Sequence, residues 1–219
     1  SRGQSRDHEH LWVNVATAGG NIDYWGEYAQ ADYPEFTVSQ DEWGFVMVEV
    51  EAGDDPGFHM KRISRGNEHE FRDNELRDEI HIRLHNEMPN TPVGIYPVGS
   101  GIDPDMLILE ANSFQDSDDD EIMAAHFRLY ENCDTASTPT YDEFINRENW
   151  YYYENTQESI ELTSLSMSSL LNGNSVYCWQ VRYRDSSLGW STWSEPLTFQ
   201  TSESQYTDNL LLNPGGELG

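Results

Sequence analysis

The sequence predicts an all-β protein built from two tandem β-sandwich domains. Hydrophobic residues make up 37% and aromatic residues 12% of the 219 residues, which is enough for packed cores. Aromatic and β-branched residues outweigh helix formers, and this balance favours strands. Short segments that alternate apolar and polar residues recur with turn residues between them, as is typical of sandwiches. A stretch rich in proline and glycine separates two such halves.

The N-terminal half begins with residues 1–9, whose polar and charged composition predicts a flexible tail. Residues 10–98 are predicted to form a β-sandwich domain of unknown family. Its expected strands are Leu11–Ala18, Glu35–Ser39, Trp43–Ala52, Phe58–Ser64 and Asp78–Asn86. In the last of these, apolar and polar side chains alternate, which indicates a strand with one buried and one solvated face.

The segment Met88–Asp105 contains four prolines and three glycines. These residues interrupt regular structure and stiffen extended linkers, so we expect an interdomain boundary here. A second sandwich is predicted over residues 103–201, and residues 202–219 are predicted to be a linker and the start of a further module. The expected strands of the second sandwich are Met106–Phe114, Met123–Asn132, Ser159–Met167, Val176–Asp185 and Pro196–Ser202.

The end of the second half resembles a known module. The segments Leu170–Gly173, Val176–Asp185 and Leu197–Thr201 are similar to the C-terminal half of fibronectin type III modules. Trp190–Ser194 also resembles the W-S-x-W-S pattern of the fibronectin-like modules in cytokine receptors, although that pattern fits secreted bacterial modules too. The resemblance implies a fibronectin type III-like, immunoglobulin-like sandwich over residues 103–201. The aromatic-rich stretch Tyr141–Tyr153 departs from the family and is expected to be an inserted loop.

The same motif predicts a stacked arrangement of side chains. Trp190 and Trp193 are three residues apart, one turn of a polyproline-like helix, so both rings face the same way. Arg182 and Arg184 alternate onto one face of the preceding strand. Their guanidinium groups could lie between the indoles, with about 0.5–1 kcal/mol for each exposed cation–π contact. We expect a structural ladder, and a ligand-binding surface is the alternative.

The last residues, Asn209–Gly219, resemble the opening strand of a jelly-roll module of carbohydrate-binding proteins. The resemblance implies that the chain comes from a longer, multidomain parent.

The charge of the chain excludes two classes of partner. Twelve basic and forty acidic residues give a net charge of −28. Such a surface repels nucleic acid and anionic lipid, because both need cationic groups. No apolar run reaches the length of a membrane span, so membrane insertion is not expected either. A solvated acidic coat is one reading of the charge, and capture of cations is the other.

The densest acidic segment is a candidate calcium site. Asp116, Asp118 and Asp120 alternate along a predicted turn, and several of their oxygens could point inward to a hard cation. The segment lacks the EF-hand pattern, so a solvated turn is the alternative. No cofactor is required, and calcium is the one candidate.

Exposed aromatic residues suggest a binding surface. Trp150, Tyr151, Tyr152 and Tyr153 are consecutive, and successive side chains of a strand point to opposite faces. At least some must therefore face solvent or a neighbour. Together with Trp25 in another loop, they predict either an interface or a stacking surface for polysaccharide.

Histidines and cysteines give weaker signals. His81 and His85 lie on one predicted strand, about 13 Å apart by strand rise, so we expect surface histidines rather than a shared metal ion. Cys133 and Cys178 form either one disulfide or two free thiols, and the outward direction expected for Cys178 favours the thiols.

No nucleophile-elbow, phosphate-loop or dinucleotide-binding pattern occurs, so we do not expect an enzyme. The sequence predicts a secreted or cell-surface, non-catalytic module that serves as spacer, adhesion or assembly unit. Its expected partners are other domains or subunits of the same protein. The alternatives are a carbohydrate-binding module of a polysaccharide-acting protein and a repeating subunit of a surface layer or extracellular filament.

Overall fold

The computed structural model describes residues 2–4, 11–15, 19–22, 24, 36–147, 150–151, 154–155, 160–167 and 171–204. All regular secondary structure in these residues is β-strand, from β1 to β16, which confirms the predicted all-β class. The described part of the chain contains no helix that is long and apolar enough to cross a membrane.

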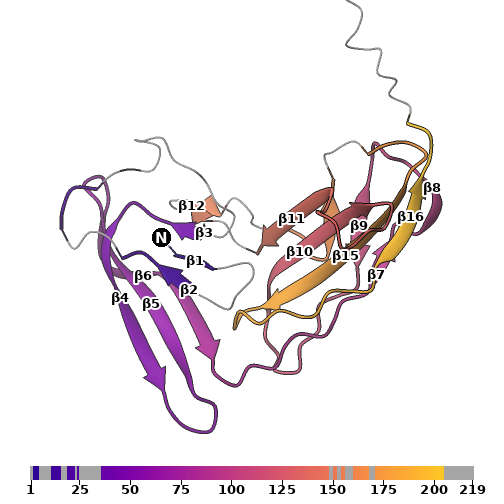
Figure 1. Cartoon of the computed structure of the whole chain (residues 1–219). Helices are drawn as coiled ribbons and strands as arrows, with labels where there is room; N and C mark the ends of the chain where they lie inside the picture. Colours follow the sequence, from indigo (N-terminus) through magenta and orange to yellow (C-terminus); the bar gives the residue numbers. More distant parts are fainter. Residues whose placement is uncertain are drawn as a thin grey trace, which may run out of the picture.

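The C-terminal half is a β-sandwich of two sheets (Figure 1). One sheet has the order β14 (Ser164–Ser166), β9 (Ile108–Ala111) and β7 (Gly94–Tyr96). The other has the order β11 (Tyr141–Asn146), β10 (Ile122–Glu131), β15 (Val176–Asp185), β16 (Leu197–Thr201) and β8 (Gly99–Ile102). This strand order is that of immunoglobulin-like sandwiches, the architecture that fibronectin type III modules share.

The N-terminal boundary of this sandwich differs from the prediction. The proline- and glycine-rich segment is not a linker, because β7 pairs with β9 in one sheet and β8 pairs with β16 in the other. The sandwich therefore begins at Gly94 rather than at residue 103. The composition has a different physical reason: the chain changes sheets here, and Gly99 and Gly101 adopt φ values of 86° and 79° that other residues disfavour.

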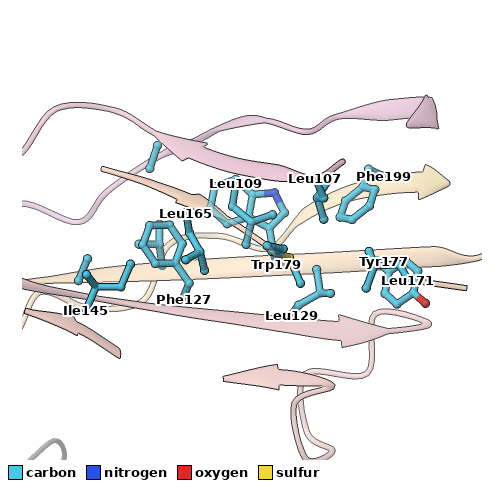
Figure 2. Close-up of a cluster of buried hydrophobic side chains, with 14 of the residues drawn as sticks. Leu107, Leu109, Phe127, Leu129, Ile145, Leu165, Leu171, Tyr177, Trp179 and Phe199 are labelled. Atoms are coloured by element: carbon cyan, nitrogen blue, oxygen red, sulfur yellow. The ribbon is translucent and has the colours of Figure 1, made fainter. Parts of the chain in front are cut away.

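Alternation along β15 places its large side chains in the sandwich core (Figure 2). Tyr177, Trp179, Val181 and Tyr183 face inward, and Trp179 is fully buried. The ring of Phe127 stacks on Trp179 with centroids 6.2 Å apart. The rest of this core includes Leu107, Leu109, Leu129, Ile145, Leu165, Leu171 and Phe199.

The N-terminal half contributes two further sheets. One is the antiparallel sheet β4 (Trp43–Glu51), β5 (Gly57–Gly66) and β6 (Phe71–Arg83). The other contains β1 (Arg2–Gln4), β2 (Leu11–Val13) and β3 (Phe36–Ser39), together with β12 (Trp150–Tyr151) and β13 (Glu154–Asn155) from the second half of the chain.

Two local predictions in these sheets were wrong. Residues 2–4, expected in a flexible tail, form β1 and pair with both β2 and β3. The stretch Tyr141–Tyr153 is not simply an inserted loop, because it starts with β11 in the sandwich and continues to β12. β12 pairs in parallel with β3, with Trp150 opposite Val38 (Figure 1). In both places the strand forms because its backbone pairs with a segment that is distant in the sequence.

The halves also share a small apolar cluster. Met60 of β5 and Ile80 of β6 are buried together with Leu188, which lies in the turn after β15. Met123 of β10 packs against the same cluster. The buried apolar side chains of the β4–β5–β6 sheet are therefore covered by residues of the sandwich.

We expect Trp179→Ala to lower the free energy of unfolding by about 3–5 kcal/mol, because it leaves a large cavity in the sandwich core. Urea denaturation of the whole chain measures the change. Val176→Ala on the same strand is the control, since Val176 is 39% exposed, and its effect should stay within about 0.5 kcal/mol. Equal effects of the two substitutions would contradict this core.

Candidate functional site

Five side chains stack on the outer face of the sandwich. The guanidinium groups of Arg128 and Arg182 each lie 4.6 Å from the ring of Trp193. Arg182 also lies 4.3 Å from the ring of Trp190, and Arg184 lies 5.1 Å from that ring. The structure thus brings together the four residues predicted for the ladder and adds Arg128.

Hydrogen bonds from two serines hold the indoles in place. Ser191 N donates to Tyr183 O at 2.9 Å, and Ser191 Oγ accepts from Tyr183 N at 3.0 Å. Ser194 makes the same pair of bonds with Val181, at 2.9 and 3.0 Å. The segment 190–194 therefore runs along β15 like an additional, side-chain-assisted strand, and the tryptophans between these anchors face the arginines.

His126 lies beneath the ladder. Its ring centroid is 4.9 Å from that of Trp193, its Nδ1 is 3.1 Å from Arg182 Nη2, and its Nε2 bonds to Asp142. Burial lowers the pKa of His126 to about 4, against the opposing effect of the Asp142 carboxylate. Since Arg182 can only donate, the neutral ring accepts at Nδ1 and donates from Nε2 to Asp142. Both nitrogens are occupied, so His126 supports the ladder and is not free to act as a base.

Sequence reasoning missed His126 and Arg128, although a signal was present. Both alternate with the core residues Phe127 and Leu129 in β10, so their side chains share the outer face. Only the pairing of β10 with β15, which places His126 opposite Arg182, shows that this face meets the ladder.

Cys133 and Cys178 form a disulfide, so the first of the two predicted alternatives is correct. Cys178 does lie on the outer face, between the inward residues Tyr177 and Trp179. The outward direction does not prevent the bond, because Cys133 follows the end of β10 and Tyr130 of that strand is opposite Cys178.

The acidic turn is closed by its own hydrogen bonds and by an arginine. Asp116 Oδ1 accepts from the backbone N–H of Asp118 at 2.7 Å, and Asp118 Oδ2 accepts from that of Glu87 at 2.7 Å. Arg83 pairs with Asp118 and Asp120 at 3.3 and 3.0 Å. No group of three or more His, Cys, Asp or Glu side chains is placed to hold a metal ion in the described residues. Calcium at Asp116, Asp118 and Asp120 stays a prediction, and the described geometry favours the alternative, a hydrogen-bonded turn.

A buried carboxyl group ties the end of β6 to the end of β15. Asp185 is fully buried, and burial raises its pKa to about 6. It accepts from Asn86 Nδ2 and from the backbone N–H of Gly189, both at 2.8 Å. A side chain at residue 189 has no room, since a Cβ there would lie 2.5 Å from Asn86 Nδ2. The hydrogen bond to Asp185 therefore holds Asn86 against the turn after β15.

A groove of about 760 Å³ lies between the β4–β5–β6 sheet and this turn. Its lining is mainly apolar and includes Val48, Phe58 and Leu188. The ionisable side chains among the described lining residues are Glu51 and Arg83, and Arg83 is already paired with the acidic turn.

The aromatic candidates are only partly placed. Trp150 and Tyr151 form β12, whose backbone pairing is described but whose side chains are not. Tyr152, Tyr153 and Trp25 lie outside the described residues, as does the segment 209–219 that resembles a carbohydrate-binding module. Sugar binding by these aromatics stays a prediction.

The sequence matches no protein family, and it matches no curated protein. Among solved structures, the chain is similar to the fibronectin(III)-like modules of CbhA from Clostridium thermocellum, with a TM-score of 0.38 and 10% identity over 72% of this chain and 67% of that one. It is also similar to a multidomain fragment of titin, with a TM-score of 0.36 and 15% identity over 71% of this chain and 49% of that one. The chain thus spans about half of the titin fragment. The fibronectin-like assignment of the sandwich rests on its strand order.

We expect Arg182→Ala to lower the free energy of unfolding by about 1–3 kcal/mol, because it removes two cation–π contacts and the bond to His126. Chemical denaturation measures the loss. Arg65→Ala is the matched control, since Arg65 is 46% exposed and lies over the single ring of Phe71 at 5.2 Å. Its effect should stay below about 1 kcal/mol. A loss for Arg182→Ala no greater than that of the control argues against a structural ladder.

Asp185 should make stability depend on pH. Burial raises the pKa of Asp185 from its ordinary value of 3.8 to about 6. The protonated carboxyl group therefore contributes to the free energy of unfolding fully below pH 3.8, and this contribution is lost as the pH rises from there through 6. Asp185→Asn should remove this dependence and raise stability at pH 7 by up to about 3 kcal/mol. The new amide nitrogen can donate to Asn86 Oδ1 if the Asn86 side-chain amide turns over, because Asn86 Nδ2 faces this position in the wild type. Asn86 Oδ1 is a buried acceptor without a hydrogen-bond partner among the described residues.

Thermal unfolding between pH 4 and pH 7 tests this expectation. Asp119→Asn is the control, because Asp119 is exposed and its φ of 60° suits asparagine. The control should follow the wild-type profile. A variant at position 185 that is less stable than wild type at pH 7 would show that the buried charge is favourable.

Proposed function

We propose that this chain is a non-catalytic module of a secreted or cell-surface protein and serves as a rigid spacer between neighbouring domains or subunits. The observation that carries the proposal is the junction between the two halves. Strand pairing of β12 with β3, the apolar cluster around Leu188 and the bond from Asn86 to Asp185 join them at three places. A spacer needs such a fixed junction in order to hold its neighbours at a set distance and angle.

The chemistry of the sandwich supports an extracellular location. A disulfide that closes a separation of 45 residues is stable in oxidising compartments and is rare in the cytosol. The net charge of −28 favours solubility and resists self-association at moderate salt. Both features suit a module that is exposed on the outside of a cell.

The ionisable groups with strongly shifted pKa values have structural partners, and this supports the proposed non-catalytic role. Burial shifts the pKa values of three described groups strongly, His126, Asp185 and Tyr183, and all three are hydrogen-bonded. None of the three belongs to the described lining of the groove. These three groups therefore have structural roles.

Assembly into a surface layer or filament is the second candidate, and strand β4 favours it. Val48 and Val50 on this strand are 57% and 80% exposed. Among the described strands β4 pairs with β5 alone, so its other edge can accept a strand from a neighbouring subunit.

Distance measurements by pulsed electron paramagnetic resonance test the spacer. One spin label is attached at position 68, in the β5–β6 turn, and the other at position 195, in the sandwich. Both labels are carried by unnatural amino acids that replace Glu68 and Glu195, so that the Cys133–Cys178 disulfide stays intact. We expect a narrow distance distribution for the wild type. Leu188→Asn should broaden it, because it removes an apolar side chain from the shared cluster while asparagine tolerates the φ of 74°.

Val176→Asn, an exposed change on the same sandwich, is the control and should leave the distribution narrow. A broad distribution in the wild type rules out a rigid spacer. Small-angle scattering at several concentrations separates the second candidate, since a particle mass that grows with concentration indicates assembly rather than a monomeric spacer.

A further inference from the structure

The apolar face of the β4–β5–β6 sheet is covered in its middle but open at its β4 edge, the outer strand of the sheet (Figure 1). Val48, Met60 and Ile80 lie side by side in one row across the three strands. Met60 and Ile80 are buried, whereas Val48 is 57% exposed. In the next row along the sheet, Val50 is 80% exposed. The apolar face therefore extends beyond the part that Leu188 and the residues around it cover.

Strand β4 lacks the features that usually protect the edge of a sheet. Natural edge strands avoid pairing with other chains by means of proline, lysine or bulges. Trp43–Glu51 contains neither proline nor lysine, and its register with β5 shifts at the Trp43/Gly44 end. The opposite edge strand, β6, has register shifts at two places and charged side chains at most positions between Arg72 and Glu79. The regular part of β4 is thus the edge that is suited to pair with a further strand.

A strand added at this edge would face the apolar groove. Residues opposite each other in paired strands point to the same face, so the inner side chains of the added strand would lie beside Val48 and Val50. Both valines line the groove, as do Leu11 and Leu84. A volume of about 760 Å³ accommodates several apolar side chains. The added strand therefore needs apolar residues at every second position.

The other face of the added strand would lie beside carboxylates. Glu49 and Glu51 alternate with the valines of β4, and their side chains are 52% and 54% exposed. Asp54 and Asp55 are exposed in the turn that follows. Lys61 pairs with Glu49 at 2.6 Å, which leaves an excess of negative charge at this end of the strand. Basic side chains on this face of the added strand would be attracted, and acidic ones would be repelled.

We propose that the open edge of β4, together with the groove beside it, binds an extended segment of another protein in which apolar and basic residues alternate. The segment pairs with β4 through backbone hydrogen bonds, places its apolar side chains in the groove and directs its basic side chains towards Glu49 and Glu51. We call this surface the β4 edge site. Binding there needs no rigid junction between the halves, so its test is independent of the spacer role.

A second copy of this chain is a poorer occupant of the β4 edge site. Pairing of two β4 strands would bring Glu49 and Glu51 of both copies onto one face of the joined sheet. Each copy also carries a net charge of −28, so the two chains repel each other. A basic segment meets neither obstacle.

Binding of synthetic peptides to the whole chain, measured by fluorescence anisotropy, tests the β4 edge site. The probe is a labelled peptide of alternating lysine and valine, about seven residues long, which is within the usual length of a strand. We expect saturable binding. A peptide with the same composition but with its lysines and valines in two blocks should bind at least about tenfold more weakly, because it cannot place its valines on one face. An alternating glutamate–valine peptide should not bind, because its charge is repelled.

Methylation of the peptide backbone tests the strand pairing. Successive N–H groups of a strand point to opposite sides, so one alternating set of them faces β4. Methylation of that set should abolish binding, and methylation of the other set should leave most of it. Equal affinity of the two methylated peptides would contradict pairing along this edge.

Substitutions at exposed positions locate the site. Val50→Gln should weaken binding of the lysine–valine peptide by at least about fivefold, because it removes an apolar contact. Val93→Gln is the control and should bind as the wild type does, since Val93 is 63% exposed but lies just before β7 in the sandwich. Glu51→Gln should also weaken binding, and Glu110→Gln, which changes an exposed acid of β9, is its control.

Circular dichroism confirms that each variant is folded, and the comparison of peptides on the wild type decides the question even if one is not. The proposal is overturned if the block peptide binds as tightly as the alternating one, or if Val50→Gln binds like the wild type. It is also overturned if the wild-type chain forms dimers that the alternating peptide dissociates, because a second copy is then the occupant.

Discussion

The antiparallel pairing of β10 with β15 is the interaction on which the rest of the sandwich depends. Its register places Phe127 opposite Val181 on the inner face and His126 opposite Arg182 on the outer face. The inner face supplies the apolar core around Trp179, while the outer face carries the disulfide and the arginine–tryptophan ladder. A slip of one residue would exchange these two faces, since successive side chains alternate. Both the core and the ladder therefore specify the same register.

Buried charge is tolerated in this sandwich because each group has a specific partner. Arg184 is fully buried, yet it lies over Trp190 and donates to the backbone oxygen of Leu188 at 3.0 Å. Asp185, the next residue, points to the opposite face of the strand and accepts two hydrogen bonds at the junction. These two adjacent residues link the ladder to the N-terminal half. The ladder and the junction are therefore connected through neighbouring residues of one strand, since Arg184 contacts Trp190 and Asp185 binds Asn86.

The sequence allowed some of these features to be predicted but not others. Strict alternation in β15 indicated which of its residues face inward, and the spacing of Trp190 and Trp193 indicated that their rings lie on one side. The role of Gly94 and the strands that follow it was misread. Proline and glycine mark both linkers and edge strands that change sheets, and local composition does not distinguish the two. In the same way, His59 and His81 are 22 positions apart in the numbering, and only the hairpin register makes them neighbours.

The sequence by itself determined the all-β class, the acidic surface and the side chains available on each face of the long strands. Those properties follow from composition and from the two-residue period of a strand, both of which are local. The tertiary structure alone decided which strands pair, that Arg128 and His126 join the ladder, that Cys133 reaches Cys178, and that β12 crosses to β3. Each of these depends on contacts between residues far apart in the chain, whose free energy is gained only when the register of the whole sheet is set.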